Sequence, residues 1–165
     1  DLNITFTAEK LLYNYPVESH VYVMDRKSGE QKVFEADSRF TKNVAEKCES
    51  GNYEQWERHN IENPHFYDLM YLPQTGMYAR LHLGGIEFDA TRDILNLMDD
   101  RDLYLTFFDK DFVVVGEAKL PSHRYNYFTG WRETNDGVAL FVDNSLDENE
   151  KTEELVLDIV RLQAD

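Results

Sequence analysis

Cysteine is almost absent from this sequence, and several catalytic signatures are missing with it. The one cysteine, Cys48, excludes an internal disulfide and any Cys-x-x-Cys redox or metal motif. The chain also lacks the Gly-x-Ser-x-Gly motif of serine hydrolases and a His-x-x-x-His zinc motif. We therefore expect no metal site and no cofactor, and the sequence names no catalytic residue.

The sequence is also poor in positive charge and in long apolar runs. It has 17 Lys and Arg against 32 Asp and Glu, which gives a net charge of −15. A field of that sign repels phosphate groups, so we expect no nucleic acid partner. No apolar run approaches the roughly 18 residues that a membrane helix needs, so we expect no membrane span. A cation, a basic protein or a neutral glycan is compatible with the charge.

Aromatic residues are abundant, at 13% of the chain, and they favour β-strands. The stretch HVYVMDRKSGEQKVFEA, residues 20–36, predicts two strands around a tight turn. In its first strand Val21 and Val23 alternate with Tyr22 and Met24, so both faces are apolar. A strand of this kind is typical of a sheet that is covered on both sides.

The hairpin belongs to a pattern that occurs three times. Four consecutive antiparallel strands are predicted over residues 3–36, four more over 65–120, and three over 124–163. Repeated four-stranded antiparallel units are typical of a β-propeller. We therefore expect one all-β domain over 1–165, built from about two and three-quarter propeller-type blades. A plain antiparallel β-sandwich or barrel is the alternative.

Two short helical insertions interrupt the strands. The first lies in residues 43–63, where Asn52 followed by Gln55 resembles a capping box. The second lies in residues 89–100, with Asp89 as the expected N-cap. We expect each helix to pack over the end of a sheet. The expected apolar stripe of the second helix consists of Ile94, Leu95, Leu97 and Met98.

Several segments, taken together, resemble a known family. They are NPHFYDLMYLP, YARLHLGGIEFD, LYLTFFDKDFVVVGEAKLP and YNYFTGW…DGVALFVDN. They resemble the C-terminal half of an uncharacterised family of exported lipoproteins from gut Bacteroidetes, a domain of unknown function whose members look like six-bladed β-propellers. The resemblance implies a periplasmic or cell-surface location. It also implies that this chain forms half of a propeller ring and does not include the family's export leader and lipid-bearing cysteine. It brings no established catalytic residues.

One strand carries a candidate binding face. Tyr78, Arg80 and His82 alternate along the strand and therefore share a face. Arginine offers a planar fork for carboxylate or phosphate, and histidine offers a titratable donor and acceptor. His65 and Tyr67 lie on the partner strand of the same hairpin and could join them.

A structural reading of these residues is open as well. Arg80 could pair with an acidic neighbour such as Asp68, and His82 could hydrogen-bond to backbone. Elsewhere, Tyr125, Tyr127 and Trp131 could form a platform that stacks on a sugar ring, but the sequence favours packing in the core or between blades for them.

Two function classes fit these observations. The first is a non-catalytic binding or scaffold module with a glycan or protein ligand. The second is a carbohydrate-active enzyme, a glycoside hydrolase or lyase, whose acids and Arg80/His82 face lie at the propeller channel. Propellers host such chemistry, but that is an analogy of fold alone.

The half-ring reading also predicts self-association through uncovered sheet faces. The faces in question carry Val21 and Val23 or Tyr22 and Met24 in the first unit, and Leu155, Leu157 and Ile159 or Val156 and Val160 in the third.

Overall fold

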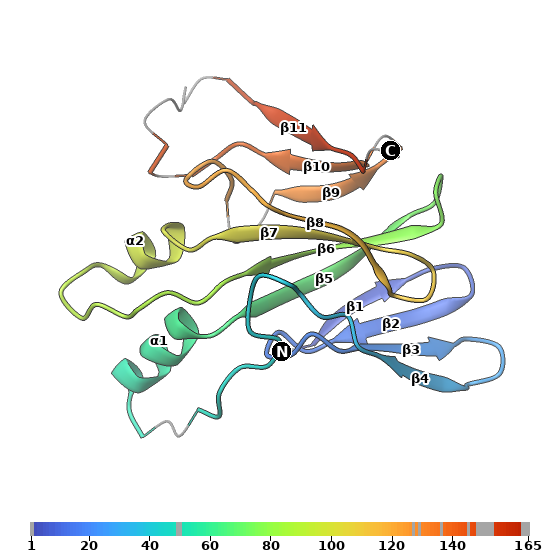
Figure 1. Ribbon diagram of the computed structural model, residues 1–165, viewed down its shortest axis with the longest axis horizontal. Coiled ribbons are helices and arrows are strands. Elements are labelled where there is room, and N and C mark those ends of the chain that lie inside the picture. The colour runs from blue at the N-terminus through green and yellow to red at the C-terminus, as the bar shows by residue number, and fades with distance from the viewer. Residues whose placement is uncertain are drawn as a thin grey trace.

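The computed structural model describes residues 2–48, 51–126, 128, 130–135, 137–144, 146–147 and 154–162. It is mostly β, with three antiparallel sheets of four, four and three strands and two short helices (Figure 1). The predicted β class and the two helical insertions are confirmed. In each sheet the strands neighbour one another in the order of the chain, so each sheet is a simple meander.

The strand bounds follow the predicted units closely. The first sheet consists of β1 (Asn3–Phe6), β2 (Lys10–Asn14), β3 (Val21–Asp25) and β4 (Gln31–Phe34). The second sheet consists of β5 (His65–Leu72), β6 (Met77–Leu83), β7 (Leu103–Phe108) and β8 (Val114–Lys119). The third sheet consists of β9 (Trp131–Thr134), β10 (Gly137–Phe141) and β11 (Leu157–Val160).

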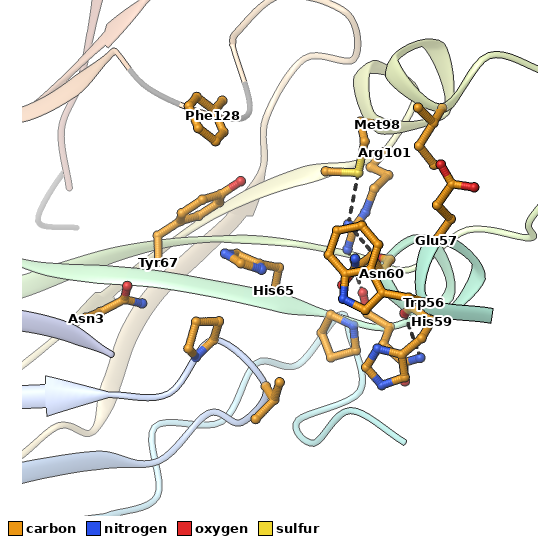
Figure 2. A pocket seen from close by; sticks show the side chains of 15 residues that line it. Asn3, Trp56, Glu57, His59, Asn60, His65, Tyr67, Met98, Arg101 and Phe128 are labelled. Atoms are coloured by element: carbon orange, nitrogen blue, oxygen red, sulfur yellow. Dashed lines mark hydrogen bonds between the residues drawn. The ribbon is translucent and has the colours of Figure 1, made fainter. Parts of the chain in front are cut away.

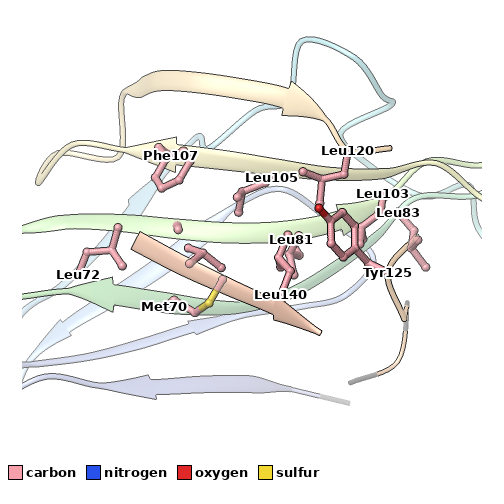
Figure 3. Packing of buried hydrophobic residues seen from close by; sticks show 12 residues of the cluster. Met70, Leu72, Leu81, Leu83, Leu103, Leu105, Phe107, Leu120, Tyr125 and Leu140 are labelled. Atoms are coloured by element: carbon pink, nitrogen blue, oxygen red, sulfur yellow. The ribbon is translucent and has the colours of Figure 1, made fainter. Parts of the chain in front are cut away.

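The second sheet lies between the other two (Figure 1). One of its faces packs on Leu12 and Val21 of the first sheet. The other face packs on Val138 and Leu140 of the third, and Figure 3 shows Leu140 beside the leucines of the second sheet. All six residues of β7 are buried because both of its faces are covered.

Side chains of the first sheet close the free edge of the second. Strand β5 is an edge strand, so its outward carbonyls lack a neighbouring strand. Asn3 donates from Nδ2 to the carbonyl of Phe66 at 2.8 Å, and Thr5 donates to the carbonyl of Leu69 at 2.6 Å. Asn14 donates to a third carbonyl of the same strand at 3.1 Å. The two sheets are therefore joined by side-chain hydrogen bonds as well as by apolar packing.

Helix α1 (Tyr53–Glu62) begins as the sequence predicts. The side chain of Asn52 accepts a hydrogen bond from the backbone N–H of Gln55 at 2.9 Å, which satisfies a donor of the first turn. The Gln55 side chain accepts from the N–H of Gly51 at 2.9 Å, one residue earlier than in a standard capping box.

Helix α2 (Ile94–Asp99) begins later than predicted, so the expected cap is wrong. Asp93 is the N-cap and accepts from the N–H of Leu95 at 2.8 Å. Asp89 instead closes a local turn by accepting from the N–H of Thr91 at 2.9 Å, and that turn competes with helix. In the short helix Leu97 is buried whereas Leu95 is 61% exposed, so Leu95 is not part of the apolar stripe. Among the described residues, no helix is long and apolar enough to cross a membrane.

The first sheet has one covered and one uncovered face, and both are apolar. Val21 and Val23 are buried against the second sheet. The opposite face carries a row of mutually paired residues that includes Ile4, Tyr22 and Val33, of which Ile4 is 48% and Val33 57% exposed. We call this the outer face of the first sheet; its members are Ile4, Phe6, Leu11, Tyr13, Tyr22, Met24 and Val33.

The third sheet is arranged in the same way. Val138 pairs with Val160, and both pack toward the second sheet. Leu157 and Ile159 point to the other side of β11 and are about half exposed. Each end of the stack of sheets therefore presents an apolar face that the described chain does not cover.

Candidate ligand site

The structure divides the five predicted site residues between two faces of the second sheet. Residues that lie opposite each other in an antiparallel pair share a face. His82 lies opposite Phe66, whereas His65 lies opposite Leu83. Tyr78, Arg80 and His82 therefore face the first sheet, and His65 lies on the other side of β5. Tyr67 is the next residue after Phe66 and so lies on the same side as His65, where its ring contacts Trp131 of the third sheet.

Arg80 is fully buried in the interface between the first two sheets. Its guanidinium donates to the carbonyls of Ser19 at 2.8 Å and Ala36 at 2.7 Å. It also lies over the rings of Phe66 and Phe108, with centroids at 4.7 and 5.4 Å. Arg80 thus ties the first sheet and the segment that follows it to the second sheet.

The charge of Arg80 is retained despite its burial. Burial lowers the pKa of the guanidinium to about 9, and the carboxylates of Asp37 and Glu117 act in the opposite direction. The group is therefore positive at neutral pH. Asp68, the partner that the sequence suggested, is exposed and does not hold it.

His82 is buried beside Arg80 and is uncharged. Its Nε2 lies 3.1 Å from Oγ of Ser38, and its ring stacks on Tyr104 with centroids 5.1 Å apart. Burial, followed by the positive charge of Arg80, lowers the pKa of His82 to about 3. The carboxylate of Glu117 lies 3.9 Å away, but a neutral imidazole forms no ion pair with it. Neither Arg80 nor His82 is placed to meet a ligand.

His65 and Tyr67 lie instead beside a cavity of about 510 Å³, which we call the helix cavity. It is bounded by the start of β1, the loop before β3, the start of β5 and both helices (Figure 2). Its volume is within the range of small-molecule sites, about 300–1,000 Å³. Helices α1 and α2, each of which was expected to pack over the end of a sheet, contact each other here. Together they form one wall of the cavity.

Aromatic rings line two sides of the helix cavity. Trp56 of α1 is 50% exposed and stacks on Tyr53 with centroids 5.7 Å apart. Tyr67 of β5 contacts the ring of His65 at 4.8 Å and that of Trp131 at 4.6 Å. Figure 2 shows the Trp56 and Tyr67 rings on either side of His65.

Several polar groups of the helix cavity are neutral and have no hydrogen-bond partner among the described residues. Burial, followed by the charge of Arg101, lowers the pKa of His65 to about 4, so this imidazole is neutral at pH 7. Within the part of the chain that the structure describes, nothing hydrogen-bonds to the imidazole of His65, the side-chain amide of Asn60 or the indole N–H of Trp56. Asn3 uses its Nδ2 for β5 and leaves Oδ1 as an acceptor.

Arg101, just after α2, forms the floor of the cavity. It is 5% exposed and donates to the carbonyls of Gly84 at 2.8 Å, Asn60 at 2.8 Å and Asn63 at 2.5 Å. These carbonyls belong to the end of α1 and the loop after β6. Arg101 therefore holds both helices to the second sheet, and three backbone oxygens surround its positive charge.

Of the five predicted site residues, His65 and Tyr67 line this cavity, and its other lining residues were not predicted. Trp56 and Asn60 are four residues apart on α1 and so share a helical face, which is a signal that the sequence contains. Arg101 carries no such signal because its partners are distant in the chain. Three aromatic residues were considered as a surface that stacks on a sugar. Tyr125 is buried, Trp131 packs on Tyr67, and Tyr127 lies outside the described residues.

Comparison with known proteins agrees with the suspected family. The profile of a family described as a domain of unknown function (DUF4221) matches residues 2–119. A crystal structure of a DUF4221 family member from Bacteroides vulgatus is similar, with a TM-score of 0.78 and 19% sequence identity. The similarity covers 95% of this chain and 44% of that one, so this chain spans less than half of the relative's length. No curated protein matches the chain.

At 19% identity the structural likeness shows a shared fold and carries no activity with it. The predicted resemblance to a Bacteroidetes domain of unknown function is thereby confirmed. The C-terminal position within a longer protein, the export and the lipid anchor stay predictions.

Proposed function

Since this chain belongs to the DUF4221 family, a domain of unknown function, we propose a function from the helix cavity itself: a non-catalytic module that binds a small ligand or part of a larger one. The observation that carries the proposal is a set of neutral polar groups that have no hydrogen-bond partner among the described residues and lie beside two aromatic rings in one cavity. Concave sites with a few convergent polar groups are the usual form of ligand sites.

The alternative, a carbohydrate-active enzyme, lacks support from the same cavity. Glycoside hydrolysis uses two carboxyl groups on opposite sides of the scissile bond. Among the described residues that line the helix cavity, Glu57 is the one carboxylate. Arg80 and His82, which that alternative would place at the reaction site, are each 1% exposed. Binding is therefore the better supported function.

We propose further that the three sheets are consecutive blades of a ring. Three observations support this arrangement: the second sheet is covered on both faces, the end faces of the first and third are apolar, and the relative of known structure is longer than this chain. The first strands of successive sheets also lie against each other, β1 against β5 and β5 against β9. In a propeller these would be the strands nearest the axis.

Protein-detected NMR with a library of neutral fragments tests the binding proposal. We expect saturable shifts that cluster on α1, the start of β5 and the Arg101 loop. Trp56→Ala should weaken these fragments at least tenfold, because the stacking surface is lost. The matched control is Leu95→Ala on α2, which is exposed and lies outside the cavity lining. The proposal would be overturned if no fragment bound saturably. It would also be overturned if the shifts lay outside the cavity and the affinity were the same in wild type and Trp56→Ala.

A further inference from the structure

The helix cavity suits a flat ligand with one apolar face. The aromatic rings of Trp56 and Tyr67 line it, and Ile94 and Met98 of α2 add apolar surface. A pyranose ring has such a shape, with C–H groups on one face and hydroxyls around its edge. Aromatic side chains provide large apolar contact with geometric preference, so a Trp face can select the C–H face of a sugar.

The unpartnered polar groups match hydroxyls better than ions. A neutral imidazole is a donor at one nitrogen and an acceptor at the other, and a side-chain amide is both as well. His65 and Asn60 therefore offer paired donor and acceptor functions, which is what a row of hydroxyls needs. The indole N–H of Trp56 and Oδ1 of Asn3 add one further donor and acceptor. A ligand hydroxyl can satisfy both kinds of group at once.

The electrostatics of the cavity disfavour charged ligands of either sign. The guanidinium of Arg101 is already surrounded by three carbonyls, so it offers little to a phosphate or carboxylate. The net charge of −15 also repels anions. A cation would need carboxylates, and Glu57 is the one carboxylate among the described lining residues.

From these three properties we infer that the ligand of the helix cavity is a neutral sugar, an uncharged pyranose or the end of a neutral oligosaccharide. Trp56 stacks on its C–H face, and His65 and Asn60 hydrogen-bond to its hydroxyls. The inference rests on the proposed binding function and names its ligand class.

Titration calorimetry and NMR with defined sugars test the inference. The neutral probes are methyl β-glucopyranoside, methyl β-galactopyranoside, N-acetylglucosamine and their neutral β-linked disaccharides; the charged probes are glucuronate and glucosamine. We expect at least one neutral probe to bind in the helix cavity at least tenfold more tightly than both charged ones. Its affinity should not change between pH 8 and pH 6, because His65 stays neutral in that range.

Variants separate stacking from hydrogen bonding. Trp56→Ala should abolish measurable sugar binding, Trp56→Phe should retain part of it, and Asn60→Ala should weaken it several-fold. Leu95→Ala should bind as the wild type does. The fold of each variant is checked by its NMR spectrum without ligand.

The outcomes distinguish this inference from the proposed function. If neutral non-sugar fragments fill the cavity while no sugar binds, the sugar inference fails and the binding function stands. If no probe of any kind binds there, both fail. Tighter binding of a charged sugar, or of a short Pro- and aromatic-containing peptide, also overturns the assignment to a neutral sugar.

Discussion

Arg80 and His82 show how a polar residue can be essential to an interface between sheets. Both side chains are almost fully buried, and each contacts a group of the segment that follows the first sheet: Arg80 donates to the carbonyl of Ala36, and Nε2 of His82 lies 3.1 Å from Oγ of Ser38. Tyr78, Arg80 and His82 alternate along β6 and so form one face of the strand. From the sequence, this face was predicted to bind a ligand. The partners that make this face internal are Ala36 and Ser38, 44 residues away in both cases, and no local pattern reveals them.

The buried imidazole of His82 predicts a pH-dependent stability. Its pKa is lowered from 6.5 to about 3, so between these values the unfolded chain binds a proton that the folded chain does not. The contribution of His82 to stability is therefore complete above about pH 6.5 and is lost as the pH falls toward 3. Between pH 7 and pH 5 we expect wild type to lose about 2 kcal/mol relative to His82→Gln.

Urea unfolding of the two proteins across this pH range measures that difference directly. His65 titrates in the same direction, but it is present in both proteins and cancels. A difference in unfolding free energy that stays constant from pH 7 to pH 5 would contradict the neutral state of His82.

At the scale of elements, strands were easier to predict than the helices that build the site. Apolar alternation and turn residues located the sheets, because strands depend on the local period of the sequence. The start of α2 was misplaced because Asp89 and Asp93 are both competent caps, and a local turn at Asp89 decides between them. The meeting of α1 with α2 depends on Arg101 and could not be read from either helix alone.

Gly85 fixes how closely the end of α1 approaches the second sheet. A Cβ on Gly85 would lie 2.2 Å from the carbonyl oxygen of Glu62, which is backbone and cannot move alone. We expect Gly85→Ala to displace the C-terminal end of α1, to lower the free energy of unfolding by about 1–3 kcal/mol and to weaken binding in the helix cavity.

Urea unfolding and hydrogen exchange of the α1 amides measure this effect. Gly51→Ala, at the other end of α1, is the matched control because its Cβ would meet its nearest neighbour, the Gln55 side chain, at 3.5 Å. If Gly85→Ala and Gly51→Ala had the same free energy of unfolding, the close contact between the end of α1 and the loop after β6 would not contribute to stability.

At the scale of the whole molecule, the end faces decide how the chain behaves in solution. The outer face of the first sheet exposes 66% of Phe6 and 57% of Val33. Exposed apolar patches of several hundred Å² tend to find partners. The net charge of −15 opposes association, and salt screens that repulsion.

We therefore expect the 165-residue chain to self-associate as salt and protein concentration rise, measured by size exclusion with light scattering. The double substitution Phe6→Lys and Val33→Lys should shift the chain toward monomer. Leu95→Lys with Val113→Lys adds the same charge at exposed apolar positions outside that face and should leave association unchanged. A wild type that stays monomeric at high concentration and high salt, with its end sheets protected from exchange, would refute the half-ring reading.

The meander order of the sheets makes the chain divisible. Every described strand pairs within its own sheet, and the sheets meet through side chains such as Asn3, Thr5 and Asn14 rather than through shared strand ladders. A gene segment that encodes one sheet could be duplicated or deleted without cutting a hydrogen-bonded ladder. Proteins assembled in this way can change length during evolution in whole-sheet steps. Each new boundary then needs a matching apolar face and side-chain hydrogen bonds of the kind that Asn3, Thr5 and Arg80 make here, but no new strand pairing.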